Sequence, residues 1–219
     1  MSSPLVVDYY SDVLCVWAWI AQRRIDELTQ YLGDKVEIKY HYLDVFGDAI
    51  NKIPIQWHDR GGYEGFSAHV IESASAYEYA QINTEIWSEI RPTSSANPHL
   101  VLKAVELSYS SQHSIELALK FRQAFFVDAQ DISNIDILFV LIEQAGLDCE
   151  KVNKAIVDGS AMAALMSNYQ QAKTLGLKGS PSYIIDNGRQ ILYGNVGYRV
   201  LLANIEALLN KPRSEASWC

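Results

Sequence analysis

Ser11-Asp12-Val13-Leu14-Cys15-Val16-Trp17-Ala18-Trp19 is the stretch that decides the fold, and it directly follows an apolar run at residues 5–10. The run has the β-branched and aromatic composition of a buried strand, so we expect a strand that ends here and a helix whose first turn carries Cys15. Three residues on, where a Cys-x-x-Cys motif would have its second sulfur, the chain has Ala18. The spacing indicates a thiol site with one sulfur, or a redox site that has lost its chemistry.

Cys15 is the candidate nucleophile. A helix N-terminus presents unpaired N–H groups and the positive end of the helix dipole, which together stabilise a thiolate. Free cysteine titrates near about 8.5, and this position can lower the pKa by one to several units. Because the thiolate is the reactive form, we expect Cys15 to react at neutral pH. The alternative is that Cys15 is a small buried hydrophobic residue between Leu14 and Trp17.

The composition excludes several classes of protein. The chain has 219 residues, 18 of them basic and 26 acidic, and its formal net charge of −8 argues against nucleic acid or an anionic membrane as partner. No stretch approaches the roughly 18 apolar residues of a membrane span. The histidines show no metal-ligand spacing with each other or with the cysteines, so we expect no metal site.

The expected compartment is the cytoplasm. The first four residues, Met-Ser-Ser-Pro, lack the basic region of a secretory signal. The three cysteines, Cys15, Cys149 and Cys219, are an odd number and widely separated, so they imply no disulfide framework. A mature form whose signal had been removed would fit the periplasm equally well.

The rest of the chain predicts a strand–helix–strand unit, a block of helices, and a hairpin followed by a helix. Residues 15–32 have apolar residues at helical spacing and end at Gly33, and residues 35–43 alternate like a second strand, which implies a parallel pair. Asn187-Gly188 predicts a type I′ hairpin turn between strands at 182–186 and 190–193, before a helix at 200–209. The expected middle helices are 63–80, 99–110, 114–127, 134–145, 149–157 and 161–175.

This order resembles the DsbA-like thioredoxin superfamily, which also contains the 2-hydroxychromene-2-carboxylate isomerases and the kappa-class glutathione transferases. Three local matches carry the resemblance: the stretch from Ser11 to Trp19, the segment 91–97 together with 131–133, and Lys178-Gly179-Ser180-Pro181-Ser182-Tyr183. It implies an α/β thioredoxin-like domain formed by residues 1–62 and 177–210. An all-helical domain at 63–176 is inserted after the second strand, and a tail follows at 211–219.

The resemblance also implies site residues. Pro181 is expected to be a cis proline that shapes the site, and the Ser180 backbone beside it would pair with an extended substrate. An ordinary trans proline at the start of a strand is the alternative. Further substrate contacts are expected at Ser11, Trp17 and Ala18.

Ala18 departs from the dithiol pattern. A mixed disulfide at Cys15 must wait for an external thiol or for another cysteine of this chain. Cys219 is the one candidate internal resolver, and a free thiol on the tail is the alternative. Cys149, at an expected helix start, is assigned to packing. The leading hypothesis is therefore a thiol–disulfide oxidoreductase with one catalytic cysteine, exchanging thiols through a mixed disulfide.

Two other functions stay open. The isomerase and transferase relatives have serine at the reactive position and an acid followed by arginine after the hairpin. This chain has Asn195 and Arg199 in the matching stretch, where they would hold the carboxylate of glutathione. The other alternative is a redox-inactive binding or chaperone-like module. We expect no tightly bound cofactor, glutathione as a candidate cosubstrate, and a thiol or disulfide partner. Because related glutathione-using enzymes are commonly dimers, a homodimer is a further candidate.

Overall fold

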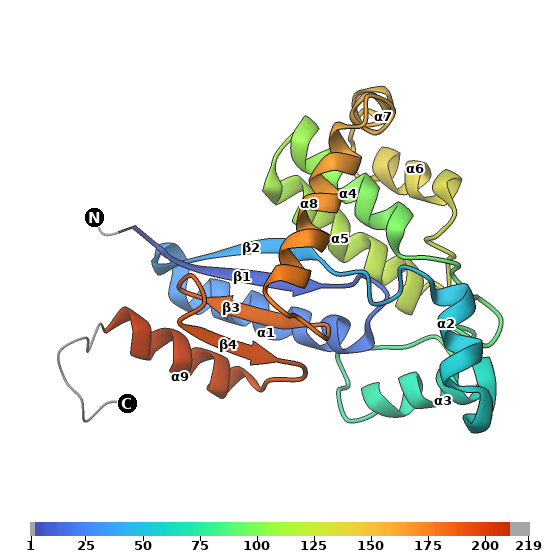
Figure 1. Ribbon diagram of the computed structural model, residues 1–219, viewed down its shortest axis with the longest axis horizontal. Helices are drawn as coiled ribbons and strands as arrows, with labels where there is room; N and C mark the ends of the chain where they lie inside the picture. Colours follow the sequence, from blue (N-terminus) through green and yellow to red (C-terminus); the bar gives the residue numbers. More distant parts are fainter. Residues whose placement is uncertain (1–2, 211–219) are drawn as a thin grey trace.

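A four-stranded mixed sheet forms the centre of the computed structural model, which describes residues 3–210 (Figure 1). Strands β1 (Leu5–Ser11) and β2 (Val36–Tyr42) are parallel, as the sequence predicts. Strand β3 (Ser182–Ile185) pairs antiparallel with β1, and β4 (Gln190–Tyr193) pairs antiparallel with β3, so the order is β2-β1-β3-β4. The carboxyl end of β1 therefore lies beside the start of β3.

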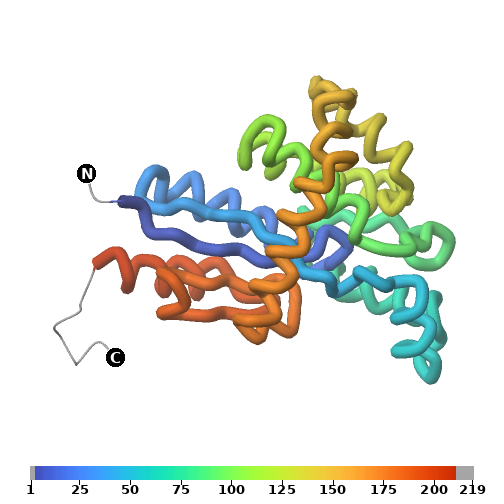
Figure 2. The backbone as a smooth tube through the Cα atoms, turned by 45° about the horizontal axis from the view of Figure 1, so that its top comes forward, coloured from blue at the N-terminus to red at the C-terminus, as the bar shows by residue number. Residues whose placement is uncertain are grey.

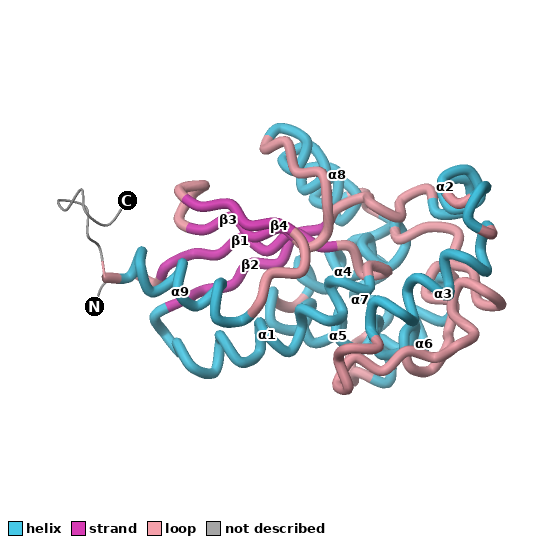
Figure 3. Tube along the Cα trace, turned by 90° about the horizontal axis from the view of Figure 1, so that it is seen from below, coloured by secondary structure: helices cyan, strands magenta, loops and turns pink. Residues whose placement is uncertain are grey.

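Alternating side chains of β1 face two different layers. Val7 and Tyr9 pack with residues of α1 (Val16–Leu32) and α9 (Tyr198–Leu209), which lie along one face of the sheet (Figure 3). Tyr10 points to the other face, where it packs with Ala172 of α8 (Ser160–Thr174). This period of two is the expected behaviour of a strand buried on both faces.

The remaining helices form one large apolar core with the start of α1. Figure 2 shows α8 (orange) crossing the carboxyl ends of β1 and β2. Helices α2 and α3 lie at the opposite end of the molecule from α9. No helix within residues 3–210 is both long and apolar enough to cross a membrane. The remaining bounds are α2 Ala49–Gln56, α3 Gly62–Ala74, α4 Ala96–Ser108, α5 Ser111–Phe126, α6 Ile135–Gln144 and α7 Cys149–Val157, with short 3-10 turns at Gly33–Lys35 and His58–Arg60.

Two helix predictions were wrong in the region after β2. Helix α2 was not predicted, because it is short and its Pro54 is typical of a helix break. Helix α3 ends at Ala74, six residues before the predicted end. The chain after the helix contacts α1, where the Trp19 indole N–H donates to the Gln81 carbonyl at 3.1 Å.

The hairpin turn is confirmed. Asn187 and Gly188 both have positive φ, +57° and +88°, and the Arg189 N–H donates to the Asp186 carbonyl. The order of elements is the thioredoxin-like arrangement with added helices that the sequence predicts. The domain boundaries at residues 62/63 and 176/177 stay predictions, and the tail at 211–219 lies outside the described residues.

Candidate thiol site

Cys15 lies at the N-cap of α1, in extended conformation. Its N–H donates to the Asp12 carbonyl at 3.1 Å, and its own carbonyl accepts from the N–H groups of Ala18 and Trp19. The thiol donates to the Ser180 carbonyl at an Sγ–O distance of 3.2 Å. The Ser180–Pro181 bond is cis, as expected. Two segments separated by 165 residues thus meet at one sulfur.

The electrostatics at Cys15 correct the expectation of a lowered pKa. Burial raises the pKa of the Cys15 thiol. The Ser180 side chain and the N–H groups of Ala18 and Trp17 act in the opposite direction but do not outweigh burial. The side chain is only 6% exposed. In addition, only the protonated thiol can donate to the Ser180 carbonyl. The helix N-terminus alone therefore does not make Cys15 a thiolate in this conformation.

Asp12 holds the loop that presents Cys15. One carboxylate oxygen accepts from the Leu14 N–H at 2.9 Å, and the other accepts from the Phe46 N–H and the Ser95 hydroxyl, both at 2.8 Å. The Asp12 N–H donates to the Ser180 hydroxyl at 2.9 Å. The side chain is fully buried, and burial raises the pKa of Asp12 to about 6. This carboxyl joins β1, the chain after β2, and the start of α4.

His99 of α4 supports the next residue of the loop. Its Nε2 accepts from the Val13 N–H at 3.2 Å, and its Nδ1 lies 3.0 Å from the Tyr169 hydroxyl. Because Nε2 is an acceptor, the neutral ring has its proton on Nδ1 and donates to Tyr169. Burial holds the pKa of His99 well below its ordinary value, and the positive charges of Arg122 and Lys103 act in the same direction. His99 is therefore a neutral positioning group.

Three of the expected substrate contacts differ in exposure. Ser11 is fully buried and its hydroxyl accepts from the Arg122 guanidinium at 2.9 Å, so it offers no surface to a substrate. Ala18 is also fully buried. Trp17 is half-buried against the helical core and stays a predicted contact. Both residues are buried in this conformation, and a contact with substrate stays a prediction for them as well.

Asn195 and Arg199 are exposed, but they differ in their bonding. The Asn195 amide accepts from the Arg24 guanidinium and donates to the Tyr77 hydroxyl at 2.8 Å. Arg24 also donates to the Val196 carbonyl at 2.8 Å. Asn195 therefore ties α1 to the chain after β4, whereas a ligand-binding role for it or for Arg199 stays a prediction.

A groove of about 500 Å³ borders the cis-proline loop. One of its lining residues, Gly179, directly precedes Ser180 in the chain. Another, Gly194, donates its N–H to the Pro181 carbonyl at 2.8 Å. Its walls are mostly backbone because three of the five lining residues are glycine. The lining residues are Gly176, Lys178, Gly179, Tyr193 and Gly194.

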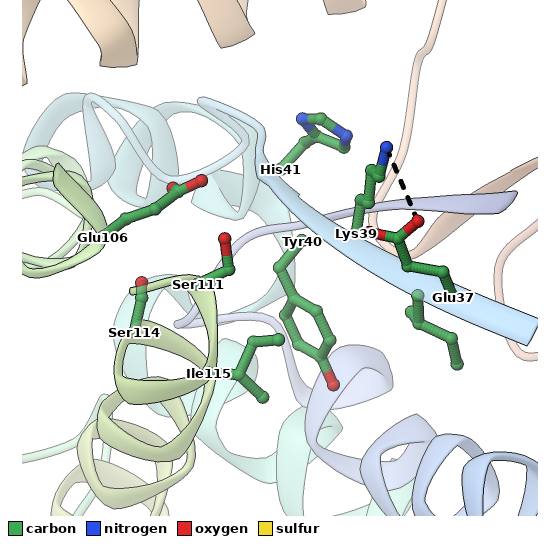
Figure 4. Close-up of a pocket in the computed structure, with 9 residues that line it drawn as sticks. Glu37, Lys39, Tyr40, His41, Glu106, Ser111, Ser114 and Ile115 are labelled. Atoms are coloured by element: carbon green, nitrogen blue, oxygen red, sulfur yellow. Dashed lines mark ion pairs between the residues drawn. The ribbon is translucent and has the colours of Figure 1, made fainter. Parts of the chain in front are cut away.

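A smaller pocket of about 140 Å³ lies between β2 and the α4–α5 region (Figure 4). One ion pair joins two of its lining residues, Lys39 and Glu37, whose side chains are half-exposed. None of the predicted site residues lines it, so we assign it no chemistry. The lining residues are Glu37, Ile38, Lys39, Tyr40, His41, Glu106, Ser111, Ser114 and Ile115.

Cys149 lies away from these contacts. Cys149 is the first residue of α7, and its thiol is 3.5 Å from the Phe139 carbonyl at the edge of the helical core. Cys219 lies outside the described residues, so its role as a resolving thiol stays a prediction. Within residues 3–210, no group of three His, Cys, Asp or Glu side chains is arranged to hold a metal ion.

Sequence reasoning missed Asp12, His99 and Arg122 as parts of the site. Asp12 stood inside the deciding stretch, and Ser95 and His99 are four residues apart at a helix start, which puts them on one face. The position of Asp12 and the spacing of Ser95 and His99 could therefore have identified these residues from the sequence. For Arg122 no such sequence pattern exists, because nothing in the neighbouring residues of α5 distinguishes a buried arginine from an exposed one.

The sequence model of one family, described as "DSBA-like thioredoxin domain", matches residues 6–206. Among curated proteins, the chain is 24% identical over 223 residues to the ClpXP adapter protein SpxH of Halalkalibacterium halodurans. That match covers 97% of this chain and 70% of the adapter.

Solved structures share the fold. A probable DsbA oxidoreductase from Streptomyces coelicolor has a TM-score of 0.75 at 19% identity, covering 96% of this chain and 92% of that one. The cytosolic disulfide reductase DsbM from Pseudomonas aeruginosa has a TM-score of 0.68 at 18% identity (93% and 100% covered), and it is also known with GSH. A 2-hydroxychromene-2-carboxylate isomerase has a TM-score of 0.63 at 14% identity (95% and 98% covered).

Proposed function

Because this chain belongs to the DSBA-like thioredoxin domain family, we propose that it is a thiol–disulfide oxidoreductase that works through one cysteine, Cys15. The observation that carries the proposal is the contact between the Cys15 thiol and the Ser180 carbonyl at a cis-proline. A sulfur at a helix start beside such a loop can receive an extended substrate next to its own backbone.

The exchange needs two steps. Cys15 loses its proton to solvent, and the thiolate attacks one sulfur of a disulfide R–S–S–R′. The old S–S bond breaks, a Cys15–S–S–R bond forms, and R′S⁻ leaves and takes up a proton. A second, external thiolate then attacks the R sulfur, which regenerates the Cys15 thiolate and releases a new disulfide. Ala18 has no sulfur, so the electron pair that reduces the substrate comes from external thiols.

Substrate backbone is expected to bind at Ser180. Within residues 3–210, no group accepts from the Ser180 N–H, and its carbonyl is engaged only by the Cys15 thiol. An extended substrate that donates to this carbonyl would displace the thiol proton from it. Binding would thereby remove one interaction that favours the protonated sulfur. The groove lined by Gly179 and Tyr193 continues from this point and offers room for neighbouring substrate groups.

Glutathione is the proposed external thiol, and the cytoplasm is the proposed compartment. Supporting both is the structural likeness to a disulfide reductase that is named as cytosolic and was also crystallised with GSH. Reduction of a glutathione mixed disulfide then gives a protein thiol and, after the second step, oxidised glutathione.

The test is Cys15→Ser in a glutathione-coupled assay with a glutathionylated peptide. Loss of all exchange activity, with Cys149→Ser as matched control retaining it, is the expected result. Trapping of a glutathione adduct on Cys15, identified by peptide mass spectrometry, supports the intermediate. Undiminished exchange in the Cys15→Ser protein would refute the proposal.

A second candidate is a binding module without redox chemistry. The observation that favours it is the 6% exposure of Cys15 together with the raised pKa of its thiol. The sequence relative named as a ClpXP adapter is consistent with a role in binding protein. If Cys15 in the folded protein resists alkylation up to about pH 9, and no exchange occurs, this second candidate replaces the first.

The isomerase or transferase function has less support. Its relatives hold glutathione through an acid followed by arginine after the hairpin, and here the matching position is Asn195, already bonded to Arg24 and Tyr77. Saturable binding of S-methylglutathione that is lost in Arg199→Ala would restore this alternative.

A further inference from the structure

One charged side chain lines the groove beside the cis-proline loop. Three of the five lining residues are glycines and one is Tyr193, so Lys178 is the lining residue that carries a charge. Lys178 is exposed, and it takes part in none of the ion pairs of residues 3–210. Its ammonium group is therefore available to a negative group of a ligand in this groove.

The chain itself holds Lys178 close to the reactive sulfur. Lys178 and Ser180 are two residues apart, so their Cα atoms are separated by at most about 7 Å. The Ser180 carbonyl in turn lies 3.2 Å from the Cys15 Sγ. An extended peptide advances by about 3.3 Å per residue, and the four-carbon stem of lysine is flexible. A substrate group that is one or two residues from the substrate's own cysteine therefore comes within reach of Lys178.

Gly179, between these two residues, leaves room for a substrate backbone. Its φ lies outside the left-handed region, so its backbone conformation does not require glycine. A Cβ at this position would meet no atom of residues 3–210 within 4 Å beyond its chain neighbours, so packing does not require glycine either. Close approach of a ligand to the backbone is a further reason for a glycine. Gly179 thus favours a peptide lying directly against this segment.

The opposite wall of the groove is the end of β4. Tyr193 is the last residue of this strand, and its side chain is 52% exposed. Gly194, which follows it, is held at the cis-proline loop by the bond from its N–H to the Pro181 carbonyl at 2.8 Å. The groove therefore lies between the loop that contacts the sulfur and an exposed aromatic side chain.

The local charge differs in sign from that of the whole chain. The formal net charge of −8 repels an acidic ligand at long range. At physiological ionic strength, however, exposed charges are largely screened beyond about 8 Å. A carboxylate in the groove is therefore affected mainly by Lys178.

We propose that Lys178 is a specificity-determining residue of the thiol site: it binds a carboxylate one or two residues from the cysteine of a peptide disulfide, and thereby favours acidic peptides. The inference rests on the proposed exchange function and names its substrate class. The terminal carboxylates of glutathione have the same chemistry as an acidic side chain, so glutathione disulfide forms a separate arm of the test.

Symmetric disulfides of short peptides test this preference. Each peptide is acetylated and amidated and has Glu, Gln or Lys directly before or directly after its one cysteine. The rate at which the Cys15–peptide adduct forms, followed by mass spectrometry, is divided by the rate of the same disulfide with free cysteine. Because an exposed ion pair contributes modestly, we expect a Glu peptide to react about two- to fivefold faster than its Gln counterpart. The difference should disappear in 1 M NaCl, where the screening length is about 3 Å.

Two substitutions and a matched control assign the preference to Lys178. Lys178→Gln should bring the Glu/Gln rate ratio to about one, and Lys178→Glu should make the Lys peptide the fastest. Lys173→Gln removes an exposed lysine in the last turn of α8 that does not line the groove, so it should keep the ratio of the unchanged protein. If Lys178→Gln slows the reaction of glutathione disulfide but leaves the Glu/Gln ratio unchanged, the assignment to acidic peptides is overturned.

A binding measurement without exchange separates this inference from the proposed function. Peptides with S-methylcysteine cannot exchange, and NMR titration gives their affinities for the unchanged protein and for Lys178→Gln. A Glu preference that Lys178→Gln abolishes, in a protein without exchange activity, upholds the site and refutes the oxidoreductase. Exchange activity with equal rates and affinities for Glu and Gln peptides keeps the oxidoreductase and refutes the role of Lys178. A protein that neither exchanges with nor binds any of the peptides refutes both.

Discussion

His99→Phe should destabilise the protein by an amount that depends on pH. Phenylalanine has a similar volume and keeps the stacking on Tyr42, where the ring centroids are 4.7 Å apart. It removes the acceptor for the Val13 N–H and the donor to the Tyr169 hydroxyl. Val13 is fully buried, so its N–H finds no water, and an orphaned buried donor costs about 1–3 kcal/mol. The lost bond to Tyr169 adds about 0.5–1.5 kcal/mol, giving about 2–4 kcal/mol at pH 7.

The pH dependence follows from the low pKa of His99. In the unfolded chain histidine titrates near about 6.5, whereas in the folded protein burial keeps the ring neutral well below that pH. The folded state then binds fewer protons, so this contribution to stability is complete above about pH 6.5 and is lost as the pH falls. With a slope of at most about 1.4 kcal/mol per pH unit, the wild-type protein loses about 2 kcal/mol between pH 6.5 and pH 5.

Urea unfolding followed by tryptophan fluorescence at pH 7, 6 and 5 measures both effects. The difference between wild type and His99→Phe should shrink from about 2–4 kcal/mol at pH 7 to about 0–2 kcal/mol at pH 5. Tyr169→Phe is the control: it removes one bond and no imidazole, so its smaller cost should not change over this range. A His99→Phe difference that is constant with pH would refute the assignment of His99 as a neutral acceptor.

Two further outcomes are expected from the same region. For Asp12→Asn, the stability difference from wild type should change with pH in the opposite direction. Since the folded pKa of Asp12 is raised to about 6, its favourable contribution is present at low pH and falls by about 3 kcal/mol as the pH rises from about 4 to about 6. Equal pH profiles for the two proteins would contradict this. Asn195→Ala should cost about 1–2 kcal/mol in a urea titration, because it removes the bonds to Arg24 and Tyr77. Arg199→Ala, which removes no hydrogen bond of the described residues, should stay within about 0.5 kcal/mol, and equal costs would contradict the role of Asn195.

Local patterns were sufficient for most of the elements. The apolar run before Ser11 predicts β1, and the alternation after Gly33 predicts β2, because strand periodicity depends on neighbouring residues alone. The cis bond at Pro181 was also expected, on the strength of its resemblance and its pairing with Cys15. In contrast, no local pattern revealed that α3 ends at Ala74, or that the chain after it contacts α1 through the Trp19–Gln81 hydrogen bond.

The sequence by itself determined that one sulfur, at Cys15, begins a helix and that Ala18 denies it a resolving partner in the motif. Only the tertiary structure decided the chemistry around that sulfur. Helix α4 brings Ser95 and His99 to the loop from 83 and 86 residues away, and α5 brings Arg122 to Ser11. The packing that brings these groups together also excludes water from the Cys15 thiol. Burial therefore raises the pKa of Cys15, although its place in the chain favours a thiolate, because desolvation is a property of the whole fold and the helix dipole is a property of one segment.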